Sequence, residues 1–338
     1  MTDRRTVLKG LVAAPALLAV GCAQRMSTTP AGVLNVGQTS NSVAFFPLFV
    51  AEKNGYFTDE GITLGDRPRL GTGAKLAAAV KSGSIDIGAG VITDAFNLAK
   101  IDDGTRMITS LTTEFYVDIV VAHSFAGPGD DASLKDKAKA LVGRTIGITG
   151  PASGTEALVK HLFTVIGKNA ATDSTLVNLG SVATAALGAL KAGRVEALAF
   201  FQPIAQQAEA AGIGRTYVSP ARGDVPGLRG VLHGVTFSTR RLLDRKKKEL
   251  AGFQRAMGRA LADIHGDADE ARALLGAYLK ASSPTALDAL MPILLKETPT
   301  RPDLDEKAYD KAVTFHLDSG LIRKAPAYAD VIPEEFRN

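Results

Sequence analysis

The sequence contains little of the side-chain chemistry that metal centres and many active sites use. Of 338 residues, one is cysteine, five are histidine and none is tryptophan. One cysteine cannot form an internal disulfide, and the histidines lack the His-x-x-x-His spacing of a helical metal site. No Gly-x-x-x-x-Gly-Lys-Ser/Thr motif for nucleotide phosphates is present either. We therefore expect no metal and no cofactor, and any ATP hydrolysis must come from another chain.

The first residues have the composition of an export signal. Arg4 and Arg5 precede an apolar stretch over 10–20, which is shorter than the ~20 residues that cross a bilayer. The arginine pair resembles a twin-arginine signal, and a general secretion signal is the alternative. We expect residues 1–21 to be a signal peptide and residues 22–32, which are polar and rich in turn formers, to be a flexible tether.

The single cysteine stands where a lipid anchor requires one. Residues 18–22, Leu-Ala-Val-Gly-Cys, resemble a bacterial lipobox, in which cleavage leaves the cysteine first and its sulfur carries a diacylglycerol. Each buried lipid methylene contributes ~0.8 kcal/mol to membrane binding, so several chains hold a protein on the surface. We expect Cys22 to be lipidated and the protein to be exported to the periplasm or the cell-envelope membrane surface. In the alternative, the signal is cleaved elsewhere and Cys22 is incidental.

Charge and length restrict the remaining possibilities. Without residues 1–21, which hold three basic residues and one acidic residue, the formal net charge falls from +4 to +2. This charge is small and scattered, so we expect no nucleic-acid partner. The basic run over 240–248 carries no aromatic residue and is typical of a solvated helix face. The remaining length exceeds the ~250–300 residues at which one core usually divides into domains.

Two segments of the chain repeat the same pattern. A strand expected at 33–37 leads through a polar turn into a helix, and a strand expected at 145–148 does the same. Each unit continues to the end of a helix, a glycine and a second strand, with Gly83 and Gly193 in equivalent places. The spacing of 47 positions between the first strand and the glycine is the same in both units. The repeat predicts two lobes of similar βαβ construction.

Four short motifs follow one another in a defined order. They are Pro47–Phe57 with Glu60-Gly61-Ile62, then Gly83–Gly88, Leu141–Gly147 and Ser153-Gly154-Thr155. Together they resemble the nitrate/sulfonate/taurine family of ABC-transporter solute-binding proteins, which includes SsuA-like and thiamine-pyrimidine-precursor-like members. The resemblance spans about 33–240. It implies an α/β, two-lobed periplasmic-binding-protein fold of type II, with two hinge strands and a ligand between the lobes.

The resemblance also implies how the chain is divided. Lobe one is expected at 33–121 plus 236–338, and lobe two at 122–235, with crossing strands near 117–122 and 234–238. The tail is expected to pack on lobe one. Its apolar pattern predicts helices at 248 onward, 268–280, 284–296 and 305–319.

Ligands of open α/β sheets bind beyond the carboxyl ends of the strands, which makes the polar loops there candidates. The turn 149–155 leads into a helix, whose free N–H groups and dipole favour an anion. Simple N-capping of that helix is the alternative. Gln202 stands where many relatives in the family carry an acidic residue before proline. The expected ligand-binding residues are Ser40, Asn41, Gly73, Thr93, Phe115, Ser153, Gly154, Thr155 and Gln202.

The expected function is that of a lipid-anchored receptor without enzymatic activity. It would close around a small organic anion, sulfonate, taurine-like or carboxylate, and present it to an ABC permease and ATPase on separate chains. One alternative is an enzyme on the same fold, such as a desulfinase or a pyrimidine synthase. Those relatives depend on cysteines, and Cys22, the one cysteine, is expected to carry the lipid, so no thiolate remains. A membrane-tethered ligand sensor without transport is the other alternative.

Overall fold

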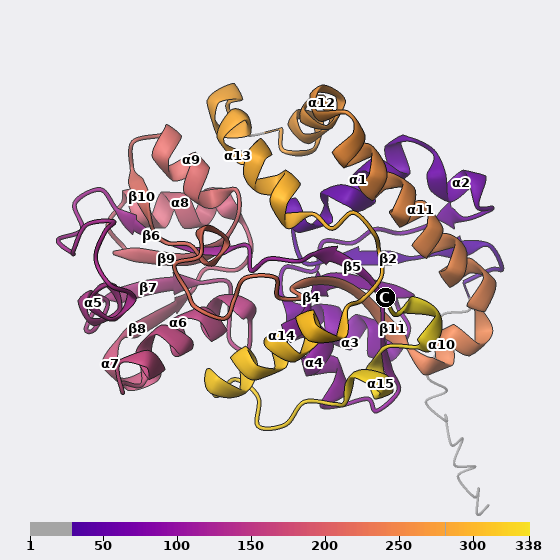
Figure 1. Ribbon diagram of the computed structural model, residues 1–338, viewed down its shortest axis with the longest axis horizontal. Helices are drawn as coiled ribbons and strands as arrows, with labels where there is room; N and C mark the ends of the chain where they lie inside the picture. The colour runs from indigo at the N-terminus through magenta and orange to yellow at the C-terminus, as the bar shows by residue number, and fades with distance from the viewer. Residues whose placement is uncertain (1–28, 281) are drawn as a thin grey trace, which may run out of the picture.

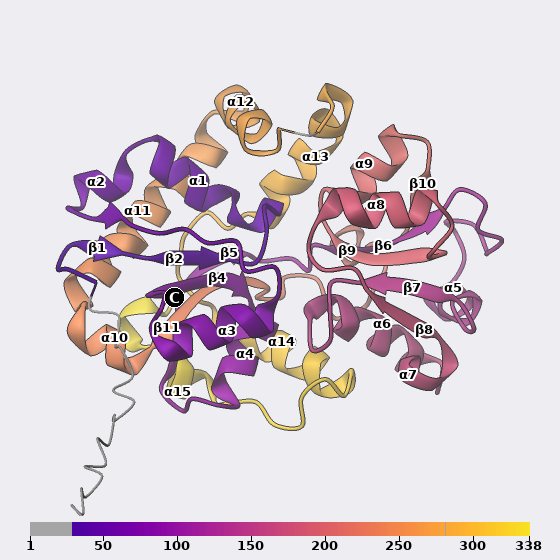
Figure 2. The same cartoon turned by 180° about the vertical axis from the view of Figure 1, so that it is seen from behind.

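The computed structural model describes residues 29–280 and 282–338 (Figure 1). The expected signal peptide, Cys22 and most of the expected tether lie outside the described residues. No helix in the described part of the chain combines the length and the apolar character needed to cross a membrane. Two lobes lie side by side along the long axis of the molecule (Figures 1 and 2).

Lobe one is built on a four-stranded sheet in the order β2-β4-β11-β5, in which β11 (Gly234–Thr239) comes from the later part of the chain, as does helix α11 (Lys247–Gly266). β2 and β4 are parallel, and β11 is antiparallel to both β4 and β5. Helices α3 and α4 cover one face and α1 and α11 the other, so the strands are buried (Figure 2). The elements before the first crossing are β1 (Val33–Leu34), β2 (Val36–Gln38), η1 (Val43–Phe45), α1 (Phe46–Lys53), α2 (Tyr56–Asp59), β3 (Thr63–Leu64), α3 (Gly73–Ser82), β4 (Ile87–Val91), α4 (Ile92–Ala99) and β5 (Thr105–Thr112).

Lobe two is built on a five-stranded sheet in the order β10-β6-β9-β7-β8. β7 is parallel to β8 and β9, whereas β6 is antiparallel to β9 and β10. The expected strand at 145–148 is β7. The elements are β6 (Val117–Ala122), α5 (Leu134–Ala140), β7 (Thr145–Ile148), α6 (Gly154–Val165), α7 (Ala170–Asp173), β8 (Thr175–Asn178), α8 (Ala183–Lys191), β9 (Ala197–Phe201), α9 (Ile204–Ala210), β10 (Gly214–Val218) and η2 (Pro220–Arg222).

The chain passes between the lobes through residues 113–116 and 219–233. β6 forms its hydrogen bonds with β9 and β10, so it lies wholly in lobe two. β11 pairs with β4 and β5 over its whole length, so it lies wholly in lobe one. The expected boundary after 121 is therefore wrong by one strand, because β6 belongs to lobe two. The expected boundary after 235 is wrong by about two residues, because lobe one resumes where β11 begins at Gly234. Alternating apolar residues predict a strand, but they do not tell to which sheet its edges are bonded.

The tail after β11 (Gly234–Thr239) is helical, as predicted. It packs mainly on lobe one, but α13 also touches α9 and α14 touches α6, both in lobe two. Figure 1 shows α13 above the junction of the lobes and α14 below it. The elements are α10 (Arg240–Arg245), α11 (Lys247–Gly266), α12 (Ala268–Tyr278), α13 (Pro284–Glu297), α14 (Glu306–Asp318), α15 (Tyr328–Val331) and η3 (Glu334–Phe336).

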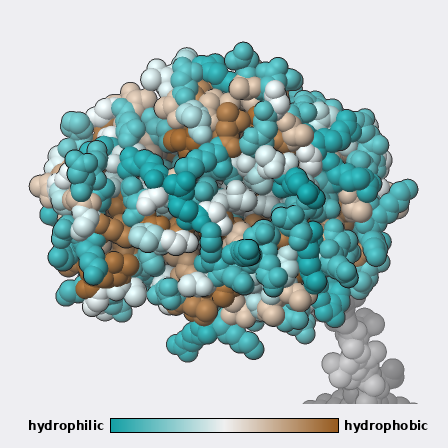
Figure 3. All heavy atoms as spheres, viewed as in Figure 1, coloured by the Kyte–Doolittle hydropathy of each residue, from teal (hydrophilic) through white to brown (hydrophobic). Residues whose placement is uncertain are grey.

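Few large apolar side chains are exposed on the described surface. Figure 3 shows one face that is mostly hydrophilic, with apolar residues in small separate patches. The large apolar side chains that are most exposed are Val182, Ile101 and Leu317, at 59%, 56% and 41%. Val182 precedes α8, Ile101 follows α4 and Leu317 lies on α14, so these side chains form no continuous apolar surface on the described part of the chain.

Candidate functional site

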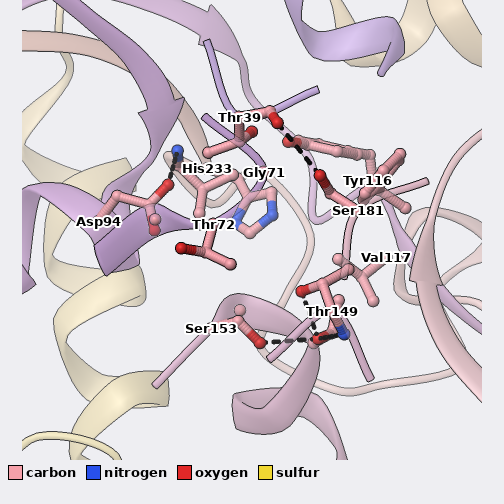
Figure 4. A pocket seen from close by; sticks show the side chains of 15 residues that line it. Thr39, Gly71, Thr72, Asp94, Tyr116, Val117, Thr149, Ser153, Ser181 and His233 are labelled. Atoms are coloured by element: carbon pink, nitrogen blue, oxygen red, sulfur yellow. Dashed lines mark hydrogen bonds between the residues drawn. The ribbon is translucent and has the colours of Figure 1, made fainter. Parts of the chain in front are cut away.

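A cavity of about 50 Å³ lies between the two lobes (Figure 4). Both lobes and both crossing segments contribute to it. The lining residues are Thr39, Gly71, Thr72, Gly73, Val91, Asp94, Tyr116, Val117, Thr149, Ser153, Gly154, Thr155, Ser181, Phe201 and His233. Such a volume holds a few water molecules, so a ligand of this site must be small or must hold the lobes further apart.

Hydrogen bonds join the lobes around this cavity. Asn97 Nδ2, on α4 of lobe one, donates to the carbonyl of Ala152 at 2.9 Å. Ser181 Oγ, in lobe two, donates to the carbonyl of Thr39 at 3.1 Å (Figure 4). Gly154 comes so close to lobe one that a Cβ there would lie 3.4 Å from both His233 Cε1 and Thr93 Oγ1. The described chain is therefore in a closed arrangement.

The lobe-two side of the cavity is the N-terminus of α6. Ser153 caps this helix, because its Oγ accepts from Glu156 N at 3.2 Å and donates to Gly150 O at 2.6 Å. Thr155 Oγ1 accepts from Thr149 N at 3.0 Å and lies 2.7 Å from Ser153 Oγ. The first N–H groups of a helix have no partner within it, and the helix dipole places partial positive charge there. This side of the cavity favours a negatively charged group.

The lobe-one side carries the opposite chemistry. Asp94, on α4, is 3% exposed, and its Oδ2 accepts from Val91 N at 3.0 Å. Burial raises the pKa of Asp94 to about 7, and the Val91 N–H opposes this increase. Among the described residues that line the cavity, Asp94 is the one acidic side chain and none is lysine or arginine. A protonated or hydrogen-bond-donating group of a ligand fits this side.

Gly73 is required by the position of Asp94. A Cβ at residue 73 would overlap Asp94 Oδ1. Because glycine has no side chain, the N-terminus of α3 can approach the carboxyl group of Asp94. The partial positive charge of a helix N-terminus favours the ionised form of such a carboxyl group.

His233 completes the lobe-one side from the second crossing segment. It is fully buried, and neither ring nitrogen has a hydrogen-bond partner among the described residues. Its ring stacks against Phe115 at 4.0 Å and meets Tyr116 at 4.8 Å. Burial lowers the pKa of His233 well below its usual value, and His316 lowers it further. The imidazole is therefore neutral and offers a ligand one donor and one acceptor.

Comparison with known families decides the affiliation of the chain. The model of the NMT1-like family matches residues 33–277, which include every residue that lines the cavity. The chain belongs to the NMT1-like family. No curated protein matches the sequence. The match confirms the predicted relationship to the nitrate/sulfonate/taurine group of proteins, whose members also appear among similar solved structures.

Solved structures of other proteins share the fold of this NMT1-like protein. A Bordetella bronchiseptica RB50 protein is 21% identical with a TM-score of 0.77, covering 90% of this chain and 95% of its own. The alkanesulfonate-binding protein SsuA from Xanthomonas axonopodis pv. citri, bound to MOPS, is 18% identical with a TM-score of 0.71, covering 90% and 99%. The DszB C27S mutant in complex with biphenyl-2-sulfinic acid is 16% identical with a TM-score of 0.61, covering 90% and 98%. They confirm the predicted periplasmic-binding-protein fold.

The structure brings some of the predicted site residues of this NMT1-like protein to the cavity and places others elsewhere. Those that line it are Gly73, Ser153, Gly154 and Thr155. In the 38–43 loop Thr39 lines the cavity instead of Ser40, which is buried beside it. Asn41 is exposed and accepts from Arg69 Nε at 2.7 Å. Of the residues that follow β2, only Thr39 lines the cavity, and residues 40 and 41 do not.

The other three predicted residues serve packing or a different cavity. Thr93 Oγ1 is bonded to His316 Nε2 at 2.6 Å, and Phe115 packs on Phe315 at 4.9 Å, so both join lobe one to α14. The expectation that they meet the ligand is not supported by their positions. Gln202 also lies outside the cavity; its side chain donates to Glu297 Oε1 at 3.0 Å.

Sequence reasoning missed Asp94, His233 and Tyr116. Asp94 is the third residue of its helix, where an acidic residue is ordinary, so the sequence gives no signal that its carboxyl faces a cavity. His233 and Tyr116 lie on the crossing segments, and their inward position depends on how the two lobes are joined.

Proposed function

We propose that this NMT1-like protein is the solute-binding receptor of an ABC importer, whose permease and ATPase are separate chains. The observation that carries the proposal is the cavity enclosed between two lobes, which both lobes line and whose edges are bonded across the gap. A ligand held there is released only when the lobes separate, as a receptor that delivers its ligand requires. The cavity has no cysteine among its described lining residues, so the cysteine chemistry of the enzyme alternative has no nucleophile at this place.

We further propose that the ligand is a small organic acid with an amino group, such as an amino-sulfonate. Its acidic group would meet the N-terminus of α6, and its ammonium would meet Asp94. A purely anionic ligand would place like charge beside the Asp94 carboxylate, or would require that carboxyl to stay protonated. The expected organic anion is therefore refined to one that carries a donor.

The experiment is isothermal titration calorimetry with taurine, isethionate and ethanesulfonate, which carry an ammonium, a hydroxyl or only a hydrogen on the same carbon. We expect taurine to bind best, and up to about tenfold more tightly at pH 8 than at pH 6, because Asp94 ionises near pH 7. Asp94→Asn should weaken taurine at least tenfold and change ethanesulfonate little. If Asp94→Asn weakened all three compounds equally, or if ethanesulfonate bound most tightly, the proposal that the ligand carries an amino group would be contradicted.

We propose that the receptor is held on the cell envelope by a lipid on Cys22. The support is the lipobox-like stretch 18–22 together with the export-signal composition before it. Mass spectrometry of the N-terminal peptide from the membrane fraction should find a diacylglycerol-modified Cys22 as the first residue. Cys22→Ala should release the protein from that fraction. An unmodified cysteine, or a mature chain that starts elsewhere, would refute the anchor without affecting the ligand site.

A further inference from the structure

A second cavity, of about 280 Å³, lies outside the ligand site, between lobe two and α13 of the tail. Its polar lining includes Asp118 on β6, Gln202 after β9, Gln206 on α9 and Glu297 at the end of α13. Its apolar lining includes Pro292 and Ile293, also on α13. The cavity therefore combines acidic and amide groups with an apolar wall.

Each of the four buried polar side chains of this cavity has one acceptor oxygen without a partner among the described residues. Asp118, Gln202 and Glu297 are each 1% exposed, and Gln206 is 8% exposed. Four oxygens have no hydrogen-bond partner among the described residues: Asp118 Oδ1, Gln202 Oε1, Gln206 Oε1 and Glu297 Oε2. A buried acceptor without a partner costs about 1–3 kcal/mol, and an ionised one costs more. A group that supplies several donors at once would satisfy them.

The charges around the cavity leave the two carboxyl groups uncompensated. Arg222 and Lys296 line its rim, yet both are exposed, and Arg222 is bonded to Asp224 at 3.1 Å. Glu209 is also on the rim and accepts from Thr216 N. Burial raises the pKa of Asp118 to about 7, with Ser219, Arg222 and Gln202 lowering it and Glu209 raising it. Burial raises the pKa of Glu297 well above its usual value; Asp118 and Glu114 raise it further, and Gln202 and Lys296 lower it.

Two adjacent strand ends separate this cavity from the ligand site. On β6, Val117 lines the ligand cavity and Asp118 lines the second one. At the end of β9, Phe201 lines the ligand cavity and Gln202 lines the second one. Because successive side chains of a strand point to opposite sides, the two cavities lie back to back. Their occupants are therefore distinguishable by mutation.

We propose that the second cavity binds a small primary amine, with the ammonium among Asp118, Glu297 and the two glutamine amides and the alkyl chain against Ile293. An ammonium supplies three donors and one positive charge, which matches acceptors that include two carboxyl groups. No three acidic, histidine or cysteine side chains converge as metal ligands anywhere in the described residues, so the donor set fits an organic cation better than a metal cage. The site does not depend on the identity of the ligand in the first cavity.

The test is calorimetry and thermal unfolding of the purified protein at pH 7.5 with n-butylamine, with n-butanol as the uncharged control and CaCl₂ as the metal control. We expect n-butylamine to bind and to raise Tm, and n-butanol and CaCl₂ to do neither. Asp118→Asn should weaken n-butylamine at least tenfold, while Asp94→Asn, which changes a buried acid of the first cavity, should leave it unchanged. Glu297→Gln serves as a second variant if Asp118→Asn does not fold.

Several results would overturn the proposal. They are no binding of n-butylamine, binding that Asp118→Asn and Glu297→Gln leave intact, and binding that Asp94→Asn removes, which would place the amine in the first cavity. Stabilisation by CaCl₂ that depends on Asp118, without an effect of n-butylamine, would identify a metal site instead.

Discussion

Ser153 and Thr155 combine a structural role with a place at the ligand cavity. Their hydroxyls bond to each other and to the backbone at the start of α6, which is the work of an ordinary N-cap. If capping were their only role, these residues would affect the stability of the protein but not its affinity for a ligand. Their position in the cavity, opposite Asp94, is the reason to expect a second role, and the two roles make different predictions.

We predict that Ser153→Ala with Thr155→Ala will weaken binding of the best ligand by about 100-fold or more. The reason is that hydrogen bonds to a charged group contribute ~1.5–3 kcal/mol each, and ~1.4 kcal/mol is tenfold in affinity. Calorimetry gives the affinity, and thermal unfolding gives the stability of the same variant.

Ser133 provides the matched control for this pair. It caps α5 in the same lobe, accepting from Asp136 N at 3.2 Å, but it does not line the cavity. Ser133→Ala should reduce stability by about 1 kcal/mol and leave affinity unchanged. If the double variant behaves like Ser133→Ala, with a lower Tm and unaltered affinity, residues 153 and 155 are caps only.

At the scale of elements, much of the fold could be predicted because it is locally encoded. The strand at 145–148 and the tail helices, expected at 268–280, 284–296 and 305–319, lie within about two residues of their observed bounds. Apolar periodicity and capping residues act within one element, so they are visible in one stretch of sequence.

The internal repeat was also predictable, and the structure gives its physical basis. Gly83 and Gly193 both have positive φ, at 77° and 66°, where a helix ends before the next strand. The acidic residue three positions later then binds the backbone of the neighbouring first strand: Asp86 accepts from Asn35 N at 2.8 Å, and Glu196 accepts from Thr145 N at 3.1 Å. An aspartate in one lobe and a glutamate in the other perform the same task.

What the sequence could not specify depends on contacts between distant segments. β6 looks like a crossing strand in the sequence, yet its partners are β9 and β10, about 80 to 100 positions away. The alternation of Val117 and Asp118 between two cavities follows from that pairing. The site was half predicted for the same reason: the α6 turn is a local motif, whereas Asp94 and His233 meet it only after the lobes have joined.

At the scale of the whole molecule, buried carboxyl groups and buried histidines have opposite effects on how stability depends on pH. Asp94 and Asp118 have pKa values raised to about 7 by burial, and burial also raises the pKa of Glu297 well above its usual value. Between about pH 4 and 7 these groups hold more protons in the folded chain than in the unfolded chain, so rising pH destabilises the fold through them. Burial lowers the pKa of His316 to about 4 and that of His233 well below its usual value, and through the histidines rising pH stabilises the fold up to about 6.5.

We predict that the stability of the protein without added ligand or amine falls as the pH rises from 6.5 to 8. At pH 6.5 the histidines of the unfolded chain are about half protonated, so they add only a small further stabilisation before they are neutral in both states. The carboxyl groups meanwhile continue to lose protons in the fold, and their larger effect sets the direction. Each group that is still protonated contributes up to ~1.4 kcal/mol per pH unit.

Urea unfolding at several pH values measures the slope of stability against pH. Asp118→Asn and Glu297→Gln should each raise stability at pH 8 and flatten the slope, whereas Ser133→Ala should shift the curve without changing its shape. Stability that rises over this range, or a slope that neither carboxyl variant alters, would show that these groups ionise as freely in the fold as in the unfolded chain.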